Sequence, residues 1–180
     1  LERMESAPTP ASARSERSPR RSPISLPGFT SESPEAAEYL LRFDKQPELL
    51  VILDGYNVTR CDSGWPQLPL ETQREALLSL VDDMARRLRN DPQFLVVFDS
   101  AESPTGPHHR GRVAVHWAES ADRFIVAEVG VRTSIPIVVV TDDGGRGAGD
   151  AGIKEPVKRL GANVVPSARF LAAARAIAYG

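Results

Sequence analysis

The chain has 180 residues, of which 41% are hydrophobic and 26% charged, and its formal net charge is −2. This length suits one globular domain, and the apolar content is high enough for a buried core, which excludes disorder throughout. The sequence contains no apolar run of about 18 residues, so no membrane span or membrane partner is expected. The single cysteine, Cys61, excludes an internal disulfide and favours a reduced, cytoplasmic setting. Because the net charge is small, a polyanion would have to bind a local patch.

Two segments precede the predicted domain, which spans residues 48–180. Residues 1–30 are rich in Ser, Pro and Arg and predict a disordered linker, whose arginines either contact RNA phosphates or are simply solvated. Residues 31–47 predict a short helical lead-in, with a helix over residues 35–43.

The domain itself predicts strands that alternate with helices. Apolar runs at 49–53, 94–98 and 137–140 are typical of strands buried on both faces of a parallel sheet. Shorter strands are expected at 112–117 and 162–165. Helices are expected at 70–89, 120–129, 151–160 and 168–178, the last with Ser167 as its N-cap. This alternation predicts an α/β fold with a mostly parallel central sheet covered on both faces.

Acidic residues follow three of the predicted strands: Asp54, Asp99, and the pair Asp142 and Asp143. Two more, Glu119 and Asp122, lie at the start of the helix predicted after the strand at 112–117. In parallel sheets, ligands bind beyond the carboxyl ends of the strands. Two carboxylates ~4 Å apart repel by ~4 kcal/mol at an effective dielectric near ~20, so a cluster of them favours a bound cation. Oxygen ligands select Mg²⁺ or Mn²⁺ over zinc. Helix capping is the alternative for each aspartate alone, but it does not explain their convergence.

The segment Asp54-Gly55-Tyr56-Asn57 resembles the NYN domain family, a branch of the PIN-like ribonucleases, and more narrowly its YacP-like group. The resemblance runs from residue 48 to residue 178 and includes Val96-Val97-Phe98-Asp99, Ser120-Ala121-Asp122, Val139-Val140-Thr141-Asp142 and Gly161-Ala162-Asn163-Val164-Val165. It implies a PIN-like three-layer α/β/α sandwich. It also implies a metal-dependent endoribonuclease that hydrolyses single-stranded RNA with Mg²⁺ or Mn²⁺.

The resemblance also implies the site residues. The catalytic and metal-binding residues would be Asp54, Asp99, Asp122 and Asp142, with Asn57, Glu119 and Asp143 in support. Two departures from the family pattern are Arg123, where a second acidic residue often stands, and a glycine-rich stretch at 144–149 in place of a compact turn. The second departure makes Asp143 the alternative to Asp142. Some family members bind RNA without cutting it, so the alternative function is a non-catalytic RNA-binding module on the same fold.

RNA is therefore the expected partner, and a ribosome or other RNA-processing machinery is left open. His108, His109, Arg110 and Arg112 form the densest basic cluster of the predicted domain loops, where phosphate contact and a solvated loop are both consistent with the sequence. Trp65 is a candidate for base stacking.

Short sequence features disfavour three other functions. A haloacid-dehalogenase-like phosphatase needs a second aspartate where Tyr56 stands, and a receiver domain needs a lysine where Pro166 stands. The glycine-rich stretch 144–149 lacks the Gly-Lys-Ser/Thr ending of a phosphate-binding loop.

Overall fold

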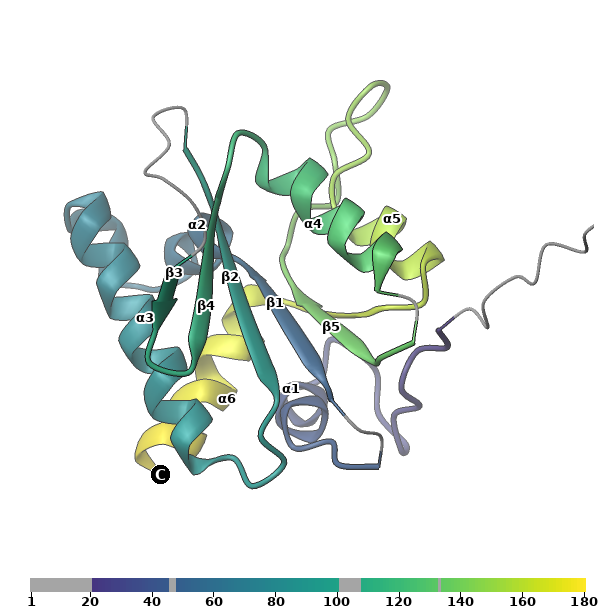
Figure 1. The fold of residues 1–180 in the computed structure, drawn as a ribbon, viewed down its shortest axis with the longest axis horizontal. Helices are drawn as coiled ribbons and strands as arrows, with labels where there is room; N and C mark the ends of the chain where they lie inside the picture. Colours follow the sequence, from purple (N-terminus) through teal and green to yellow (C-terminus); the bar gives the residue numbers. More distant parts are fainter. Residues whose placement is uncertain (1–20, 46–47, 101–107, 133) are drawn as a thin grey trace, which may run out of the picture.

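The strands of the chain form one sheet in the order β3-β4-β2-β1-β5-β6, in a computed structural model that describes residues 21–45, 48–100, 108–132 and 134–180 (Figure 1). Every neighbouring pair is parallel except β3 and β4, which form an antiparallel hairpin at one edge. The strands are β1 (Leu50–Asp54), β2 (Gln93–Asp99), β3 (His108–Arg110), β4 (Val113–Ala118), β5 (Ile137–Val140) and β6 (Asn163–Val165).

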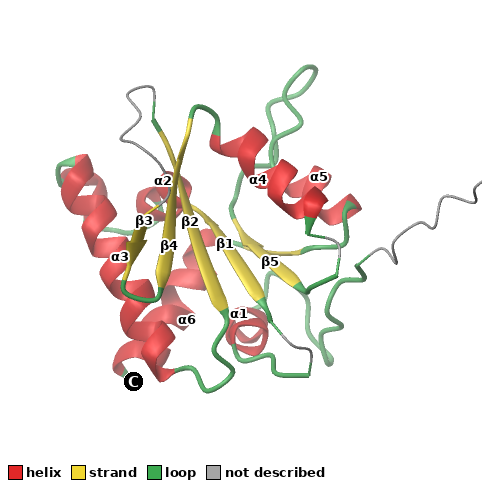
Figure 2. Cartoon of the chain, viewed as in Figure 1, coloured by secondary structure: helices red, strands yellow, loops and turns green. Residues whose placement is uncertain are grey.

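Helices cover both faces of this sheet, as Figure 2 shows. The helices are α1 (Pro34–Leu41), α2 (Gly55–Arg60), α3 (Leu70–Arg87), α4 (Ala121–Val131), α5 (Lys154–Arg159) and α6 (Ser167–Tyr179), with a short 3-10 helix at Trp65–Gln67. Helices α1, α3 and α6 pack on one face, and α4 and α5 pack on the other. The predicted three-layer α/β/α sandwich with a mostly parallel sheet is confirmed. None of the described helices is long and apolar enough to cross a membrane.

Strand β1 shows why the central strands consist of consecutive apolar residues. Its side chains alternate between the two layers: Val51 and Leu53 join the core under α3 and α6, whereas Leu50 and Ile52 join the core under α4 and α5. All five residues of the strand are buried. Burial on both faces removes the polar positions that a half-exposed strand would show, as expected for a central parallel strand.

The segment before the sheet is packed against it rather than extended away from it. Helix α1 buries Ala36, Ala37, Leu40 and Leu41, and it contacts α6. Ahead of it, the Arg21 guanidinium donates hydrogen bonds to the backbone carbonyls of Val129, Ile135 and Leu160. Residues 1–20 of the expected linker lie outside the described residues. Residues 21–30 differ from that expectation because their hydrogen bonds attach them to the domain.

Three local features differ from the sequence-based expectations. Residues 55–60 form helix α2, where a loop was expected, because Val58 and Thr59 are fully buried against the sheet and α3. Residues 108–110 add the edge strand β3, which antiparallel pairing with β4 stabilises. Ser167 is the first residue of α6 and not its N-cap, which is Pro166. The hydroxyl of Ser167 instead donates a hydrogen bond to Asn57 Oδ1, at 2.7 Å.

Candidate active site

A polar pocket of about 300 Å³ lies beyond the carboxyl ends of the central strands. Its lining residues come from four segments: the end of β1 with α2, the end of β2, the start of α4, and the loop between β5 and α5. They are Asp54, Tyr56, Asn57, Arg60, Asp99, Asp122, Asp143, Arg146 and Asp150. The pocket therefore occupies the position that the parallel topology favours for a ligand.

Asp54 is the most buried of these carboxylates, with an exposed fraction of 7%. It ends β1, and its Oδ2 accepts a hydrogen bond from the Thr141 hydroxyl at 2.9 Å. Burial raises the pKa of Asp54 to about 7, and the negative charges of Asp122, Asp99 and Asp143 act in the same direction, while the Thr141 hydrogen bond opposes them. Near neutral pH this carboxyl group is therefore balanced between its neutral and ionised forms.

Asp99 and Asp122 meet at the start of α4. Asp99 ends β2, and its Oδ1 accepts a hydrogen bond at 2.6 Å from the backbone N–H of Ala121, the first residue of the helix. Asp122 follows one residue later. Burial raises the pKa of Asp122 to about 6, and the charge of Asp143 and a hydrogen bond between the two carboxyl groups are the next causes. The pKa values of Asp54 and Asp122 are thus raised first by burial and further by the neighbouring carboxylates.

Asp143, and not Asp142, lines the pocket after β5. Asp142 turns to the other side of the strand end, where its Oδ1 accepts a hydrogen bond from the Ser167 backbone N–H and its Oδ2 accepts one from the Cys61 thiol. Its backbone N–H donates to Asn57 Oδ1 at 2.9 Å. The sequence-based assignment of Asp142 to the acidic group therefore differs from the structure, and the alternative, Asp143, takes the place.

Of the two other residues expected to support the site, Glu119 and Asn57, only Asn57 lines the pocket. Glu119 is exposed and is not among the residues that line the pocket. Asn57 lines the pocket and also connects α2 to the end of β5 and the start of α6, since its Oδ1 accepts from both Asp142 and Ser167. Cys61 lies beside this network, and burial, followed by the hydrogen bond to Asp142, raises the pKa of its thiol to about 11. The thiol therefore stays protonated at neutral pH.

Three charged residues of the pocket were not singled out from the sequence: Arg60, Arg146 and Asp150. Arg60 ends α2, and the other two belong to the loop 144–152, which projects from the sheet between α4 and α5 (Figure 1, top). Arg146 and Asp150 could have been identified from their position, because their loop directly follows a strand that is followed by aspartates.

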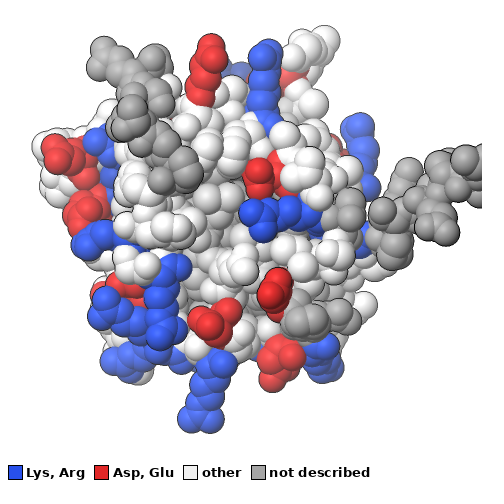
Figure 3. Space-filling model, viewed as in Figure 1, with Lys and Arg blue, Asp and Glu red and all other residues white. Residues whose placement is uncertain are grey.

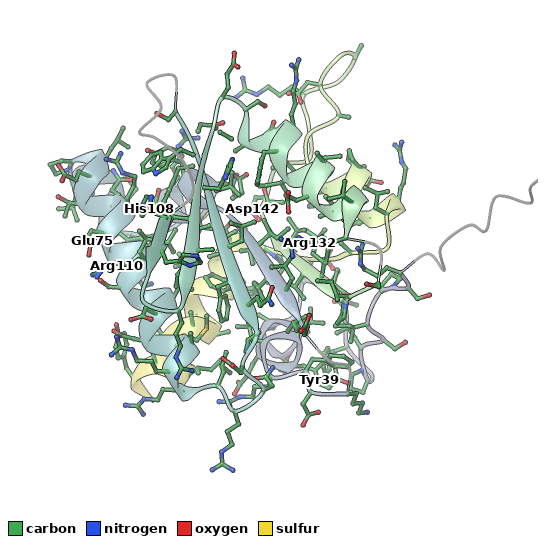
Figure 4. All side chains as sticks on the ribbon, in the orientation of Figure 1. Tyr39, Glu75, His108, Arg110, Arg132 and Asp142 are labelled. Carbon is green, nitrogen blue, oxygen red and sulfur yellow. The ribbon has the colours of Figure 1, made fainter. Side chains whose placement is uncertain are left out.

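The predicted RNA-contacting residues are divided between different parts of the surface. His108 stacks on Trp117, with ring centroids 6.4 Å apart. Arg110 forms an ion pair with Glu75 of α3, and Figure 4 shows the two residues beside each other. His109 and Arg112 line a different pocket, at the amino ends of β1 and β2.

The basic cluster therefore does not gather at the acidic pocket. In Figure 3, Lys and Arg side chains collect at the lower left, over the end of α3 and the β3–β4 turn, away from the upper edge where β2 and β4 end. Trp65 is also absent from the residues that line the pocket. Its ring packs under the Arg175 guanidinium, which lies 5.2 Å from the ring centroid.

No family model matches the sequence, and no curated protein matches it. Solved structures do match. The crystal structure of Rae1 (YacP) from Bacillus subtilis aligns with a TM-score of 0.56 and 19% sequence identity, and covers 71% of this chain and 74% of that chain. A mutant of the same protein aligns with a TM-score of 0.54 and 20% identity, over 71% of this chain and 76% of that chain. The chain therefore has a fold like that of Rae1 (YacP). The resemblance stated from the sequence motifs is confirmed at the level of the fold.

Within the YacP-like fold of this chain, the donor set of the pocket can be compared with the needs of a metal ion. Among the described residues, no three His, Cys, Asp or Glu side chains are close enough together to hold an ion by themselves. Mg²⁺ is usually held by one or two carboxylates and completes its coordination with water and substrate phosphate. The adjacent carboxyl groups of Asp122 and Asp143, with Asp54 and Asp99 around them, fit that pattern of oxygen donors.

Proposed function

We propose that the chain is a metal-dependent endoribonuclease that hydrolyses single-stranded RNA. The observation that carries this proposal is the convergence of Asp54, Asp99, Asp122 and Asp143 in one pocket at the carboxyl edge of a YacP-like sheet. Burial and mutual repulsion raise the pKa values of Asp54 and Asp122, which makes the metal-free arrangement unfavourable near neutral pH. Perturbed carboxyl groups in a concave polar site favour a functional role.

The cation in this proposal is Mg²⁺ or Mn²⁺, held by Asp122 and Asp143 with support from Asp54 and Asp99. When bound, such an ion activates water and stabilises negative charge on a phosphoryl group. The chain's own residues position this centre. Thr141 fixes one oxygen of Asp54, and the α4 N-terminus fixes one oxygen of Asp99. Asn57 holds the start of the loop after β5 in place through the Asp142 backbone.

RNA as the substrate rests on the likeness of fold together with the shape of the site. The pocket is polar, and Tyr56, which lines it, has its ring centroid 5.0 Å from that of Phe98. The hydroxyl of Tyr56 accepts a hydrogen bond from Arg74, whose guanidinium lies 5.0 Å from the Trp117 ring centroid. Aromatic rings interleaved with arginine are suited to unpaired bases.

The experiment compares cleavage of a labelled single-stranded RNA by the wild type and by Asp143→Asn, with Asp142→Asn as the matched control. We expect the wild type to cleave with Mg²⁺ or Mn²⁺ and to stop with a chelator. Asp143→Asn should abolish cleavage, whereas Asp142→Asn should retain most of it, because Asp142 faces α6. Equal cleavage by all three proteins would reject the site.

The alternative is a non-catalytic RNA-binding module on the same fold. It is favoured by the absence, among the described residues, of three carboxylate, thiolate or imidazole groups close enough to hold a metal ion. In that case the wild type would bind the RNA, would take up no Mg²⁺ and would leave the strand intact with every divalent cation tried.

A further inference from the structure

The carboxylates of the acidic pocket disfavour the binding of the phosphate that the proposed reaction requires. Five aspartates line it, and a phosphate that approaches them is repelled. A single pair of unit charges ~4 Å apart interacts by ~4 kcal/mol at an effective dielectric near ~20, so several carboxylates oppose phosphate binding strongly. One or two divalent ions offset part of this charge. A fixed cation of the protein in the same pocket would offset more and would also orient the phosphate.

Two such cations line the pocket, Arg60 and Arg146. Both are exposed, and within the described residues neither guanidinium forms an ion pair or a side-chain hydrogen bond. Other arginines around the site are engaged: Arg74 donates to the Tyr56 hydroxyl, and Arg175 pairs with Asp62 at 2.5 Å. An arginine that faces aspartates without pairing with any of them keeps its donors available to a ligand.

The two arginines come from opposite layers of the sandwich. Arg60 ends α2, whose Val58 packs in the core on the α3 and α6 side. Arg146 belongs to the loop 144–152, which leads into α5 on the other side and is called the flap here (Figure 1, above α4 and α5). A phosphate in the pocket would therefore have one guanidinium from each layer within reach.

Hydrogen bonds fix the base of the flap, and Arg146 lies next to this fixed base. Asp143 accepts hydrogen bonds from Gly145 N with its side chain, and from Ile153 N and Lys154 N with its carbonyl. Gly145 and Gly152 face each other with positive φ values of 83° and 64°. A Cβ at Gly145 would lie 2.5 Å from the Asp150 carbonyl oxygen, so only glycine fits there.

We propose that Arg146 is the phosphate-binding residue of the flap and that, with Arg60 opposite, it clamps the RNA backbone over the carboxylates. This inference rests on the proposed function for the identity of the ligand, and it adds a contact that the acidic residues do not supply. Arg146 is a binding residue in this account, because its guanidinium would touch the substrate phosphate directly. The guanidinium fork matches two phosphate oxygens, which a lysine does not.

The test measures RNA binding in the Asp54→Asn background, where the proposed function leaves the strand intact. Arg146→Ala should weaken binding of a labelled single-stranded RNA about ten-fold, the loss expected for one charge-assisted hydrogen-bonded contact. It should also reduce the slope of log K against log salt concentration by about 0.7, because one phosphate contact fewer releases fewer counterions. Arg146→Lys should restore the slope and only part of the affinity.

Arg123→Ala is the matched control. Arg123 is exposed on α4 and lines a neighbouring groove together with Gly149 and Asp150, so it lies near the flap without lining the acidic pocket. Its removal should leave the affinity within about two-fold of that of the parent protein and should leave the salt slope unchanged. Equal behaviour of Arg146→Ala and Arg123→Ala would overturn the proposal, as would a parent protein that binds no RNA.

Two further measurements separate binding from structural roles. Arg146→Ala should not change the melting temperature, because the side chain has no ion pair among the described residues. A lower melting temperature with an unchanged salt slope would show that Arg146 only neutralises the aspartates, and would overturn the clamp. Gly145→Ala should weaken RNA binding although Arg146 is intact, because it displaces the flap; wild-type affinity in that variant would overturn the role of the flap.

Failure of the proposed function gives a different pattern. If the wild type binds RNA with dependence on Arg146 but never cleaves it with Mg²⁺ or Mn²⁺, the clamp stands and the endonuclease does not. If the wild type cleaves RNA and Arg146→Ala leaves both KM and binding unchanged, the endonuclease stands and the clamp does not.

Discussion

The metal-free protein should become less stable as the pH rises through the range in which Asp54 ionises. In the folded state the pKa of Asp54 is about 7, raised from 3.8 chiefly by burial, whereas in the unfolded chain the group ionises near its ordinary value. Between these values the folded protein holds a proton that the unfolded chain has released. Stability is therefore fully present below the unfolded pKa and decreases until the pH passes the folded pKa.

The magnitude follows from the pKa difference. Each pKa unit corresponds to about 1.4 kcal/mol, and Asp54 is already half ionised in the folded protein at pH 7, so between pH 5 and pH 7 the free energy of unfolding should fall by about 2 kcal/mol through Asp54 alone. Asp122 acts in the same direction with a smaller effect, since it is partly exposed to solvent. Asp54→Asn removes the charge and keeps an oxygen that accepts the Thr141 hydroxyl. This variant should be more stable than the wild type at pH 8 and should lack most of the pH dependence.

The assay is urea denaturation of wild type and Asp54→Asn with a chelator at pH 5 and pH 8. The stability difference between the two proteins should change by about 3 kcal/mol between these pH values. Taking the difference between the proteins cancels the titration of all groups that they share. A difference that is the same at both pH values would refute the burial-driven rise in the pKa of Asp54.

Three other outcomes are expected. Asp142→Ala should lower the free energy of unfolding by roughly 1 kcal/mol, because the Ser167 N–H and the Cys61 thiol lose an acceptor. Asp143→Ala should destabilise the metal-free protein less, because the lost acceptor of the Gly145 N–H is offset by the relief of repulsion with Asp122. Urea denaturation with a chelator distinguishes the two variants, and the reverse order would contradict the placement. Arg21→Ala should cost roughly 1–3 kcal/mol through its lost hydrogen bonds, while the exposed ion pair of Arg42 should contribute at most about 1 kcal/mol; equal costs would show that the N-terminal contacts are unimportant. Mg²⁺ should raise the melting temperature of the wild type at pH 8 and leave that of Asp54→Asn nearly unchanged, and equal rises would place the ion elsewhere.

The layers of the fold could be predicted because the signal is local. The apolar run Leu50–Leu53 and its counterparts in β2 and β5 can be buried on both faces only in the centre of a sheet. The length and polarity of α3 follow from its periodic apolar stripe. The strand order β3-β4-β2-β1-β5-β6 could not be predicted in this way, because pairing between strands that are distant in sequence depends on tertiary contacts.

The pocket lies at the edge of the sheet that the sequence indicated, but Asp143 lines it after β5 in place of the expected Asp142. Asp142 and Asp143 are adjacent, and which of them faces the pocket depends on how the backbone turns after Thr141. That turn is set by Asn57 and Ser167, which the sequence does not place beside it. Asp54 and Asp99 could be expected at this edge because each ends a strand, and both line the pocket.

The cations of the pocket were missed for a related reason. Residues 55–60 lie outside the helices predicted from the sequence, so no direction could be expected for the Arg60 side chain. The burial of Val58 and Thr59 makes the segment a helix instead. Arg146 lies among glycines, for which no periodic pattern predicts a direction, and its place in the pocket follows from the hydrogen bonds of Asp143 at the base of the flap.

The central claim is that the strand-end carboxylates hold a metal ion that cleaves RNA. The most direct measurement is isothermal titration of Mn²⁺ into the wild type and Asp143→Asn, combined with cleavage of the same labelled single strand by both proteins. We expect the wild type to bind Mn²⁺ and cleave, and Asp143→Asn to lose both properties together while keeping its fold. Cleavage by Asp143→Asn at the wild-type rate, or Mn²⁺ binding that does not change between the two proteins, would contradict the claim.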